Sequence, residues 1–379
     1  MAGIYIHIPY CRKACHYCNF HFSTSLQTKN EFLDALLKEI EMRKGFFQDG
    51  VVETVYFGGG TPSLLESAEL TAIMHKLSEV FDLSEVAEIT LEANPDDITA
   101  DKVLMWQSLG VNRLSIGIQS FFEEDLVWMN RAHNAEQALQ CIRIAQENGI
   151  NNLTIDLIYG TPSLTDEKWL ANMKTAFEYN VQHLSCYALT VEPKTALDVL
   201  IRKNQREDID PDKQARHFAM LMEAAASEGY EHYEISNFAK PLFRSRHNSS
   251  YWSGAHYLGL GPSAHSFDGY RRQWNVSNNA LYIKSLNSGA ISHDTEILSL
   301  RDRANEYIMT SLRTVEGLDL NRFSSEFGSE NIAYILSQSS KHIAIGRLQQ
   351  IDQRLVLTNE GRFFADGIAS DLFLEKRDG

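Results

Sequence analysis

Apolar runs alternate with helical patterns along the first half of the chain. Six runs are predicted to be β-strands because they are short, rich in β-branched and aromatic residues, and bounded by glycine, proline or polar residues. They cover residues 4–8, 54–57, 88–93, 113–118, 153–160 and 183–189. Between them, apolar residues recur every three or four positions at 32–40, 70–80 and 170–177, which predicts helices with one buried face.

The order of these elements predicts the fold class. Repeated strand-then-helix units favour an α/β fold in which a parallel sheet closes, or partly closes, into a (β/α)6 barrel of the TIM type. Thr28 with Glu31, and Ser63 with Glu66, have the spacing of capping boxes at the starts of the first two helices.

The pattern changes after about residue 230, and this change suggests three segments. We expect a barrel over residues 1–235 and a connecting segment over 236–290, which is rich in Asn, Ser, Tyr, Trp and His. Residues 291–379 are expected to form a small winged-helix-like domain. Its helices would carry Ile308 with Leu312 and Leu320 with Phe323, followed by a strand at 355–358 and a last helix.

Composition and charge narrow the classes of function. A chain of 379 residues with 44% hydrophobic and 22% charged residues is typical of a globular protein. It has no apolar run of the roughly 18 residues that a membrane span needs. The start MAGIYIHIPY lacks the features of a secretory signal, so we expect a cytoplasmic protein. The net charge of −15 argues against general affinity for nucleic acid.

Three of the five cysteines lie within eight residues, in the segment CRKACHYC that follows the first predicted strand. They are Cys11, Cys15 and Cys18. Such crowding in a reducing compartment indicates a metal or a cluster rather than disulfides. The loop is expected at the C-terminal mouth of the barrel, where such folds carry their chemistry.

Two kinds of metal site remain open from the residues alone. A zinc ion requires four ligands, of which His16 or His21 could supply the fourth. Cys141 and Cys186 lie in helical and strand patterns and are expected to be buried as small apolar residues. The alternative is a four-iron cluster held by three thiolates, which leaves one iron open to another ligand.

The loop has the Cys-x3-Cys-x2-Cys spacing of the radical S-adenosylmethionine superfamily, which it resembles. YIHIPYCRKACHYCNF, YFGGGTPSLL, EANP, SIGIQSF, MNRAH and IDLIYGTP resemble successive blocks of the oxygen-independent coproporphyrinogen III oxidase family. This resemblance implies a radical S-adenosylmethionine barrel with a [4Fe-4S] cluster on the three cysteines. It also implies that S-adenosylmethionine binds the open iron and that electron transfer cleaves it to methionine and a 5'-deoxyadenosyl radical.

The resemblance also implies which residues bind the cofactor. Glycines in GGGTP allow a ligand to approach the backbone closely, although a tight turn explains them equally well. Polar side chains in apolar strands, such as Glu92, are costly unless paired, and a ligand or a structural hydrogen bond could pair them. Family positions that contact S-adenosylmethionine correspond to Tyr5, Tyr17, Gly59, Gly60, Thr61, Glu92, Gln119, Arg131 and Asp156. Some of these, including Gln119, Arg131 and Asp156, would serve a second cofactor molecule in the oxidase.

Differences from the oxidases suggest a particular branch. Oxidases have a cysteine where this chain has Phe20, and an arm of roughly fifty residues before the loop, which here begins at residue 11. RHNSSYW (246–252) resembles the His-Asn-x-x-Tyr-Trp motif of HemW-type haem chaperones. A neutral imidazole can ligate haem iron, so His247 is the candidate ligand, with His256 and His265 as competitors and a structural hydrogen bond as the alternative role.

The predicted function is therefore that of a haem chaperone that transfers haem to an acceptor protein. An oxygen-independent coproporphyrinogen III oxidase is the alternative, and group transfer onto RNA is a third that the acidic charge disfavours. The implied partners are haem, a haem-acceptor protein and an electron donor such as flavodoxin or ferredoxin, without nucleic acid and without a membrane span.

Overall fold

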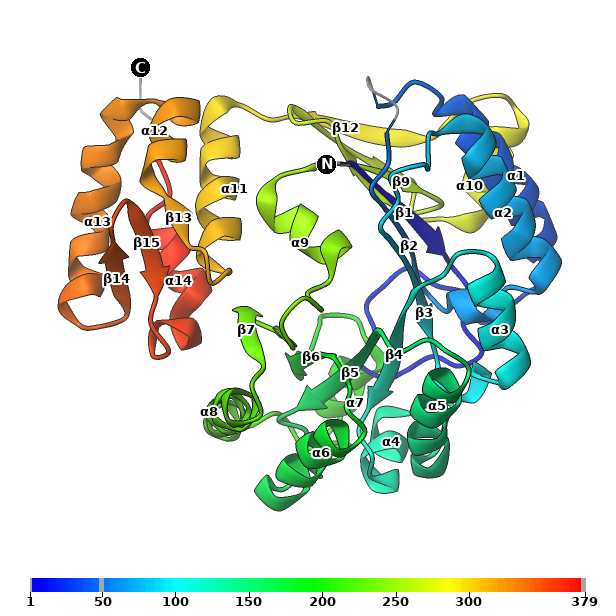
Figure 1. Cartoon of the computed structure of the whole chain (residues 1–379), viewed down its shortest axis with the longest axis horizontal. Coiled ribbons are helices and arrows are strands. Elements are labelled where there is room, and N and C mark those ends of the chain that lie inside the picture. Colours follow the sequence, from blue (N-terminus) through cyan, green and yellow to red (C-terminus); the bar gives the residue numbers. More distant parts are fainter. Residues whose placement is uncertain (1, 48–50, 376–379) are drawn as a thin grey trace.

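A curved, mostly parallel sheet dominates the computed structural model, which describes residues 2–47 and 51–375 (Figure 1). The sheet has 12 strands in the order β12-β11-β10-β9-β1-β2-β3-β4-β5-β6-β8-β7. Its central six strands are parallel neighbours, which confirms the predicted β/α series. They are β1 (Ala2–Ile8), β2 (Thr54–Gly59), β3 (Glu88–Ala93), β4 (Arg113–Gln119), β5 (Leu153–Tyr159) and β6 (His183–Ala188).

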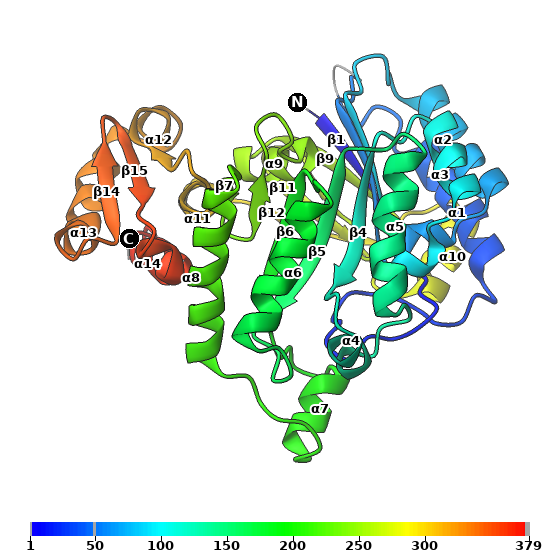
Figure 2. The same ribbon diagram turned by 60° about the horizontal axis from the view of Figure 1, so that its bottom comes forward.

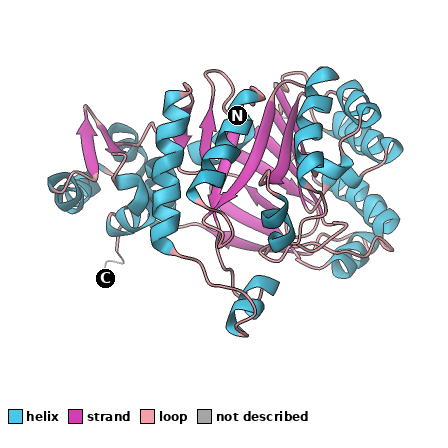
Figure 3. Cartoon of the chain, turned by 90° about the horizontal axis from the view of Figure 1, so that it is seen from below, coloured by secondary structure: helices cyan, strands magenta, loops and turns pink. Residues whose placement is uncertain are grey.

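Helices cover the outer, convex face of these strands, as Figures 2 and 3 show. The periodic segments 32–40, 70–80 and 170–177 lie within α1, α2 and α6, as predicted. The helices of this part of the chain are α1 (Lys29–Met42), α2 (Ser67–Val80), α3 (Ala100–Ser108), α4 (Glu123–Met129), α5 (Ala135–Glu147), α6 (Asp166–Glu178), α7 (Ala196–Arg202) and α8 (Pro211–Ser227).

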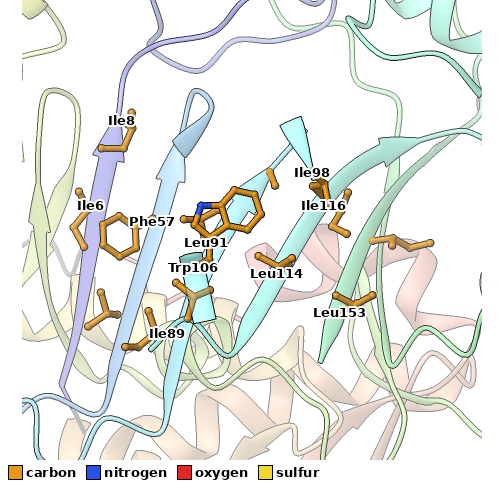
Figure 4. Packing of buried hydrophobic residues seen from close by; sticks show 14 of the residues in the cluster. Ile6, Ile8, Phe57, Ile89, Leu91, Ile98, Trp106, Leu114, Ile116 and Leu153 are labelled. Atoms are coloured by element: carbon orange, nitrogen blue, oxygen red, sulfur yellow. The ribbon is translucent and has the colours of Figure 1, made fainter. Parts of the chain in front are cut away.

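The main hydrophobic core lies between this face of the sheet and the helices. Alternate residues of each strand point into it, such as Phe57 of β2 and Leu91 of β3, and Trp106 of α3 packs against them (Figure 4). All three side chains are fully buried. Because the outward residues form this core, the intervening residues of each strand point into the concave side of the sheet, where a site can form.

Both predicted capping boxes are wrong. Thr28 is the N-cap of α1 but makes no capping hydrogen bond with its side chain; its hydroxyl instead bonds the hydroxyl of Tyr10 at 3.1 Å. Ser63 lies in a 3-10 turn, and its hydroxyl donates to Asp97. Glu66 itself is the N-cap of α2 and forms the box with Glu69. In both cases a contact with a residue distant in sequence replaces the local one.

Residues 236–290 do not act only as a connection, because most of their elements belong to the main sheet. β9 pairs parallel to β1 along the edge opposite β2. These elements, with the strands at either end, are β7 (Glu231–Glu234), β8 (Asn237–Ala239), α9 (Arg246–Ser253), β9 (His256–Leu260), β10 (His265–Phe267), β11 (Arg271–Asn275), α10 (Asn279–Asn287) and β12 (His293–Ile297). β12 and β7 end the sheet without pairing with each other, so the barrel is open.

A smaller unit follows β12 and has a hydrophobic core of its own, centred on Ile308, Phe323 and Leu355 (Figure 1). It contains helices and a three-stranded antiparallel sheet in the order β13-β15-β14. The elements are α11 (Leu300–Leu312), β13 (Leu318–Asp319), α12 (Leu320–Phe327), α13 (Ile332–Ala344), β14 (Leu348–Ile351), β15 (Arg354–Leu357) and α14 (Ala365–Asp371). The outer limits of the predicted segments, residues 1 and 379, lie outside the described residues.

No helix within residues 2–47 and 51–375 has both the length and the apolar character needed to cross a membrane.

Candidate cofactor site

The cysteine loop lies at the C-terminal end of β1, beside the ends of the other parallel strands. Backbone hydrogen bonds fix its path: Cys11 N–H donates to Ser23 O at 3.0 Å, and His16 N–H donates to Met129 O at 3.1 Å. Leu197 N–H of α7 donates to His16 O at 2.8 Å. The loop is thus held from several sides, and its three cysteines are partly exposed rather than buried.

A cavity of about 450 Å³ opens between this loop and the strand ends. It gathers residues from Cys11 to Glu192, which are 181 positions apart in sequence. Of the predicted site residues, those that line it are Cys11, Cys15, Tyr17, Cys18, Gly59, Gly60, Thr61, Glu92, Gln119, Arg131 and Asp156. Tyr5 and His247 do not line it.

The glycine turn after β2 brings the backbone close to the loop. A Cβ added to Gly60 would lie 2.6 Å from Tyr10 O and 2.8 Å from Ile8 O, so no other residue fits there. Gly59 has φ +106°, a conformation that side chains disfavour. Thr61 Oγ1 lies 3.4 Å from Cys11 Sγ, which joins the turn to the first cysteine.

Glu92, at the end of β3, is one of the acidic groups that line the cavity, with Asp156 and Glu192. Its carboxylate accepts hydrogen bonds from the Tyr56 hydroxyl at 2.7 Å and from Gly59 N–H at 3.2 Å. Burial raises the pKa of Glu92. Burial and the nearby negative charge of Glu92 together raise the pKa of Asp156 to about 7. A cationic or amine-bearing ligand would relieve both penalties.

Arg131, which lines the cavity together with these acids and with Lys13, connects the cysteine loop to the sheet. One terminal nitrogen lies 3.3 Å from both Cys15 Sγ and Tyr17 Oη. The other donates to Asn94 Oδ1 at 2.9 Å and to Gly117 O at 2.6 Å. Its buried Nε atom has no hydrogen-bond partner within the described part of the chain, which leaves a donor for a ligand oxygen.

The sequence analysis did not predict several polar residues of the site. Asn94, Ser115 and Tyr187 line the cavity, and Tyr56 holds Glu92 from the side. Tyr56 and Ser115 lie in predicted strands at positions that alternate with core residues, so strand periodicity could have placed them on the concave face. Asn94 stands within the EANP block itself.

The cysteines fit a multi-iron cluster better than a single zinc ion. Within residues 2–47 and 51–375, no group of three or more His, Cys, Asp or Glu side chains is placed to hold one metal ion. In a four-iron cluster each thiolate binds a different iron, so the sulfur atoms need not converge on one point. The possible zinc ligands are engaged elsewhere: His16 with Trp128 O, and His21 with Asn279.

Cys141 and Cys186 are each only 1% exposed, as predicted for structural cysteines. Tyr5 is not among the residues that line the cavity; its ring stacks on Tyr56 with 6.0 Å between centroids. Its hydroxyl hydrogen-bonds His7 Nδ1 at 3.2 Å.

His247 lies on α9, inside the concave side of the sheet, and is 1% exposed. Both ring nitrogens are hydrogen-bonded, Nδ1 to Thr54 Oγ1 at 2.8 Å and Nε2 to the Tyr251 hydroxyl at 2.9 Å. Burial lowers the pKa of His247 to about 3, so the imidazole is neutral. In this conformation it makes the structural hydrogen bonds of the alternative interpretation, whereas His256 and His265 are exposed.

Comparisons with known proteins agree with this architecture. Residues 5–176 match the Radical SAM superfamily and residues 298–364 match the HemN C-terminal domain. The structure of coproporphyrinogen III oxidase (HemN) from Escherichia coli superposes with a TM-score of 0.85 over 98% of this chain and 90% of that one, at 24% identity. Fold and site therefore define a radical S-adenosylmethionine protein.

Full-length sequence relatives identify the family more narrowly. The chain is 32% identical to the heme chaperone HemW of Bacillus subtilis over 97% of this chain and 98% of the relative. It is 31% identical to the heme chaperone HemW of Escherichia coli over 98% of both chains. This chain belongs to the HemW family.

Proposed function

We propose that this protein is a haem chaperone that binds haem, a [4Fe-4S] cluster and S-adenosylmethionine, and transfers haem to an acceptor protein. The observation that carries the proposal is the full-length similarity to proteins named heme chaperones. RHNSSYW at 246–252 and Phe20 in place of a further cysteine support the same branch.

Cys11, Cys15 and Cys18 are proposed to hold the cluster, because they line one cavity with an open side. When bound, such a cluster supplies one-electron reduction to a ligand on its open iron. The protein's own contribution is to fix the position of the sulfur atoms: a terminal nitrogen of Arg131 lies 3.3 Å from Cys15 Sγ and ties the cysteine loop to the sheet.

The surrounding residues are proposed to bind S-adenosylmethionine. The Gly59–Gly60 turn with Thr61 offers backbone groups at close range, and Glu92 offers a carboxylate for the amino group of the ligand. The buried guanidinium of Arg131 would receive the ligand's carboxylate or ribose oxygens. Tyr5, Tyr17, Gln119 and Asp156 complete the proposed set; Tyr5 does not line the cavity and is connected to it through Tyr56, whose hydroxyl bonds Glu92.

Haem is proposed to use His247 as an axial ligand. Because both ring nitrogens are engaged in this conformation, α9 must shift and break at least one of these hydrogen bonds to present the imidazole. His256 and His265 need no such shift because they are exposed. They are therefore the variants to compare with His247.

Haem titration of the reconstituted protein tests the proposal. We expect a shifted Soret band in the wild type, and loss of this shift in His247→Ala but not in His256→Ala or His265→Ala. Absence of binding in the wild type would refute the haem chaperone, whereas an unchanged spectrum in His247→Ala would refute only the ligand.

The alternative function is oxygen-independent coproporphyrinogen III oxidase, which the similarity to the HemN fold favours. An anaerobic assay with coproporphyrinogen III, S-adenosylmethionine and a reductant separates the two functions. Formation of protoporphyrinogen would establish the oxidase, and we expect none.

The proposed partners follow from the same function. They are haem, an acceptor protein and a one-electron donor such as flavodoxin or ferredoxin, acting in the cytoplasm without nucleic acid. The net charge of −15 supports the last point, since phosphate backbones attract basic surfaces.

A further inference from the structure

The concave faces of β2 and β3 connect the cofactor cavity with α9. In the parallel register of these strands, Thr54 is opposite Glu88 and Tyr56 is opposite Thr90. The two rows continue to Gly58 on β2 and to Glu92 on β3, because alternate residues of a strand share one face. One end of this pair of rows carries α9 and the other end carries Glu92.

The α9 end is held by hydrogen bonds to both strands. Glu88 accepts hydrogen bonds from Arg246 N–H and His247 N–H, each at 3.0 Å. The His247 ring bonds Thr54 at 2.8 Å and stacks on the Tyr56 ring, with 5.0 Å between centroids and 24° between planes. The position of α9 therefore depends directly on the position of the Tyr56 ring.

The cavity end depends on the same tyrosine. Its hydroxyl donates to Glu92 Oε1 at 2.7 Å, and Glu92 lines the cavity. A Cβ added to Gly58 would lie 2.9 Å from ring atoms of both Tyr5 and Tyr56 and 3.0 Å from Glu92 Oε1. The phenol and the carboxylate are packed without spare room, so a movement of one displaces the other.

We propose that Tyr56 is a positioning residue that couples the cofactor cavity to the His247 helix. Its hydroxyl orients the Glu92 carboxylate. When a bound ligand moves that carboxylate, the Tyr56 ring moves with it and changes the position of the His247 ring stacked on it. This inference rests on the proposed function, because it takes S-adenosylmethionine as the ligand of Glu92. Coupling is reciprocal, so release of His247 from Tyr56 must alter affinity for S-adenosylmethionine by the same factor.

Hydrogen–deuterium exchange of the cluster-reconstituted full chain, with and without S-adenosylmethionine and without haem, tests the proposal. We expect S-adenosylmethionine to slow exchange in residues 249–254 by about fivefold in the wild type. In Tyr56→Phe we expect affinity for S-adenosylmethionine to fall about tenfold, and α9 to lose its response even at saturating ligand.

Tyr282→Phe is the control, because the Tyr282 hydroxyl also donates to a glutamate, Glu39, at 2.6 Å. Tyr282 and Glu39 are fully buried, whereas Tyr56 and Glu92 are half-buried, so the control removes a hydroxyl from a more tightly packed site. This variant should keep the wild-type response. Thr54→Val tests the α9 end of the connection, because it removes the hydrogen-bond partner of His247 Nδ1. It should reduce the effect of S-adenosylmethionine on exchange in residues 249–254 while leaving the cavity residues unchanged.

Calorimetric titration of the same samples with S-adenosylmethionine distinguishes a failure of cofactor binding from a failure of the coupling between the cavity and α9. A wild type that binds S-adenosylmethionine without any change at α9 would overturn the coupling alone. The same holds if Tyr56→Phe keeps the wild-type response. A wild type that does not bind S-adenosylmethionine would overturn the coupling together with the proposed cofactor site.

Discussion

At the scale of single residues, two constraints shape the site. Close packing excludes side chains at some positions, and burial makes the charged form of some carboxyl groups unfavourable. Gly60 illustrates the first constraint, because backbone atoms of Ile8 and Tyr10 occupy the space that any side chain would need. Asp156 illustrates the second, because burial beside Glu92 holds a proton on its carboxyl up to about pH 7. At both positions the shape of the cavity restricts the residue: position 60 accepts only glycine, and position 156 holds a carboxyl whose burial is unfavourable when it is charged.

Gly60→Ala should displace the turn from the cysteine loop and lower the free energy of unfolding by roughly 1–3 kcal/mol. Iron retained after reconstitution should fall at the same time, because Thr61 would no longer contact Cys11. Urea unfolding and iron analysis measure the two effects. Gly367→Ala is the control, since a Cβ there meets nothing within 4 Å; equal behaviour of the two variants would contradict the prediction.

The buried carboxyl of Asp156 should make the free energy of unfolding fall as pH rises. Its folded pKa, about 7, lies above the ordinary value of 3.8, so the folded state binds the proton more tightly than the unfolded state. Stability from this group is full below about pH 4 and is lost as pH rises toward 7.

Asp156→Asn should therefore stabilise the cluster-free protein at pH 8 by on the order of 3 kcal/mol relative to its effect at pH 4. Urea unfolding at both pH values measures this difference. Parallel pH profiles for the variant and the wild type would show that Asp156 titrates normally.

At the scale of elements, one acidic side chain of β3 binds the first turn of α9. Glu88 is 3% exposed, and each of its oxygens accepts a backbone N–H from the first turn of the helix. An acceptor at this position satisfies donors that a helix cannot pair internally, and the helix dipole favours its negative charge. α9 can therefore lie inside the concave side of the sheet although its sequence is mostly polar.

Glu88→Ala should lower the free energy of unfolding by about 2–4 kcal/mol, because the buried His247 N–H and the partly buried Arg246 N–H both lose their acceptor. Limited proteolysis near residues 240–254 should become faster in this variant. Glu88→Gln keeps one acceptor oxygen and should lose less. If the alanine and glutamine variants were equally stable, the hydrogen bonds to the α9 backbone would not hold the helix.

At the scale of the whole molecule, an ion pair joins the C-terminal unit to the sheet. Arg313 follows α11, and two of its nitrogens donate to Glu234 Oε1 of β7 at 2.9 and 3.1 Å. The Glu234 side chain is 1% exposed. The same guanidinium lies over the Trp252 ring of α9, 5.4 Å from its centroid. Arg313 therefore contacts the sheet, α9 and the C-terminal unit.

Arg313→Ala should lower the free energy of unfolding by about 3 kcal/mol, because it leaves the carboxylate of Glu234 buried without its cation. We expect calorimetry to resolve a separate, earlier transition of the C-terminal unit. Arg354→Ala removes the ion pair with Asp319, which is more exposed, and should cost under about 1 kcal/mol. A single unchanged transition in Arg313→Ala would mean that other contacts join the two units.

Local patterns were sufficient wherever local geometry decides structure. Short runs of β-branched and aromatic residues located the strands that carry Phe57 and Leu91, helical spacing located α1, α2 and α6, and the cysteine spacing marked the loop after β1. The resemblance of short blocks added residues such as Glu92 and Arg131, which the structure brings to one cavity. In each case the signal lies in neighbouring residues, because period and turn chemistry are set by backbone geometry over a few positions.

Only the tertiary structure decided which distant segments meet. Thr28 and Ser63 had the spacing of capping boxes but formed contacts with other elements. The motif left His247 open as a haem ligand or as a structural hydrogen-bonding residue, and only the structure shows that α9 folds into the concave side of the sheet and buries His247 against Tyr56. The physical reason is the same in both cases. Burial and the pairing of polar groups stabilise contacts between segments far apart in the chain. A short sequence pattern does not specify which distant segment makes such a contact.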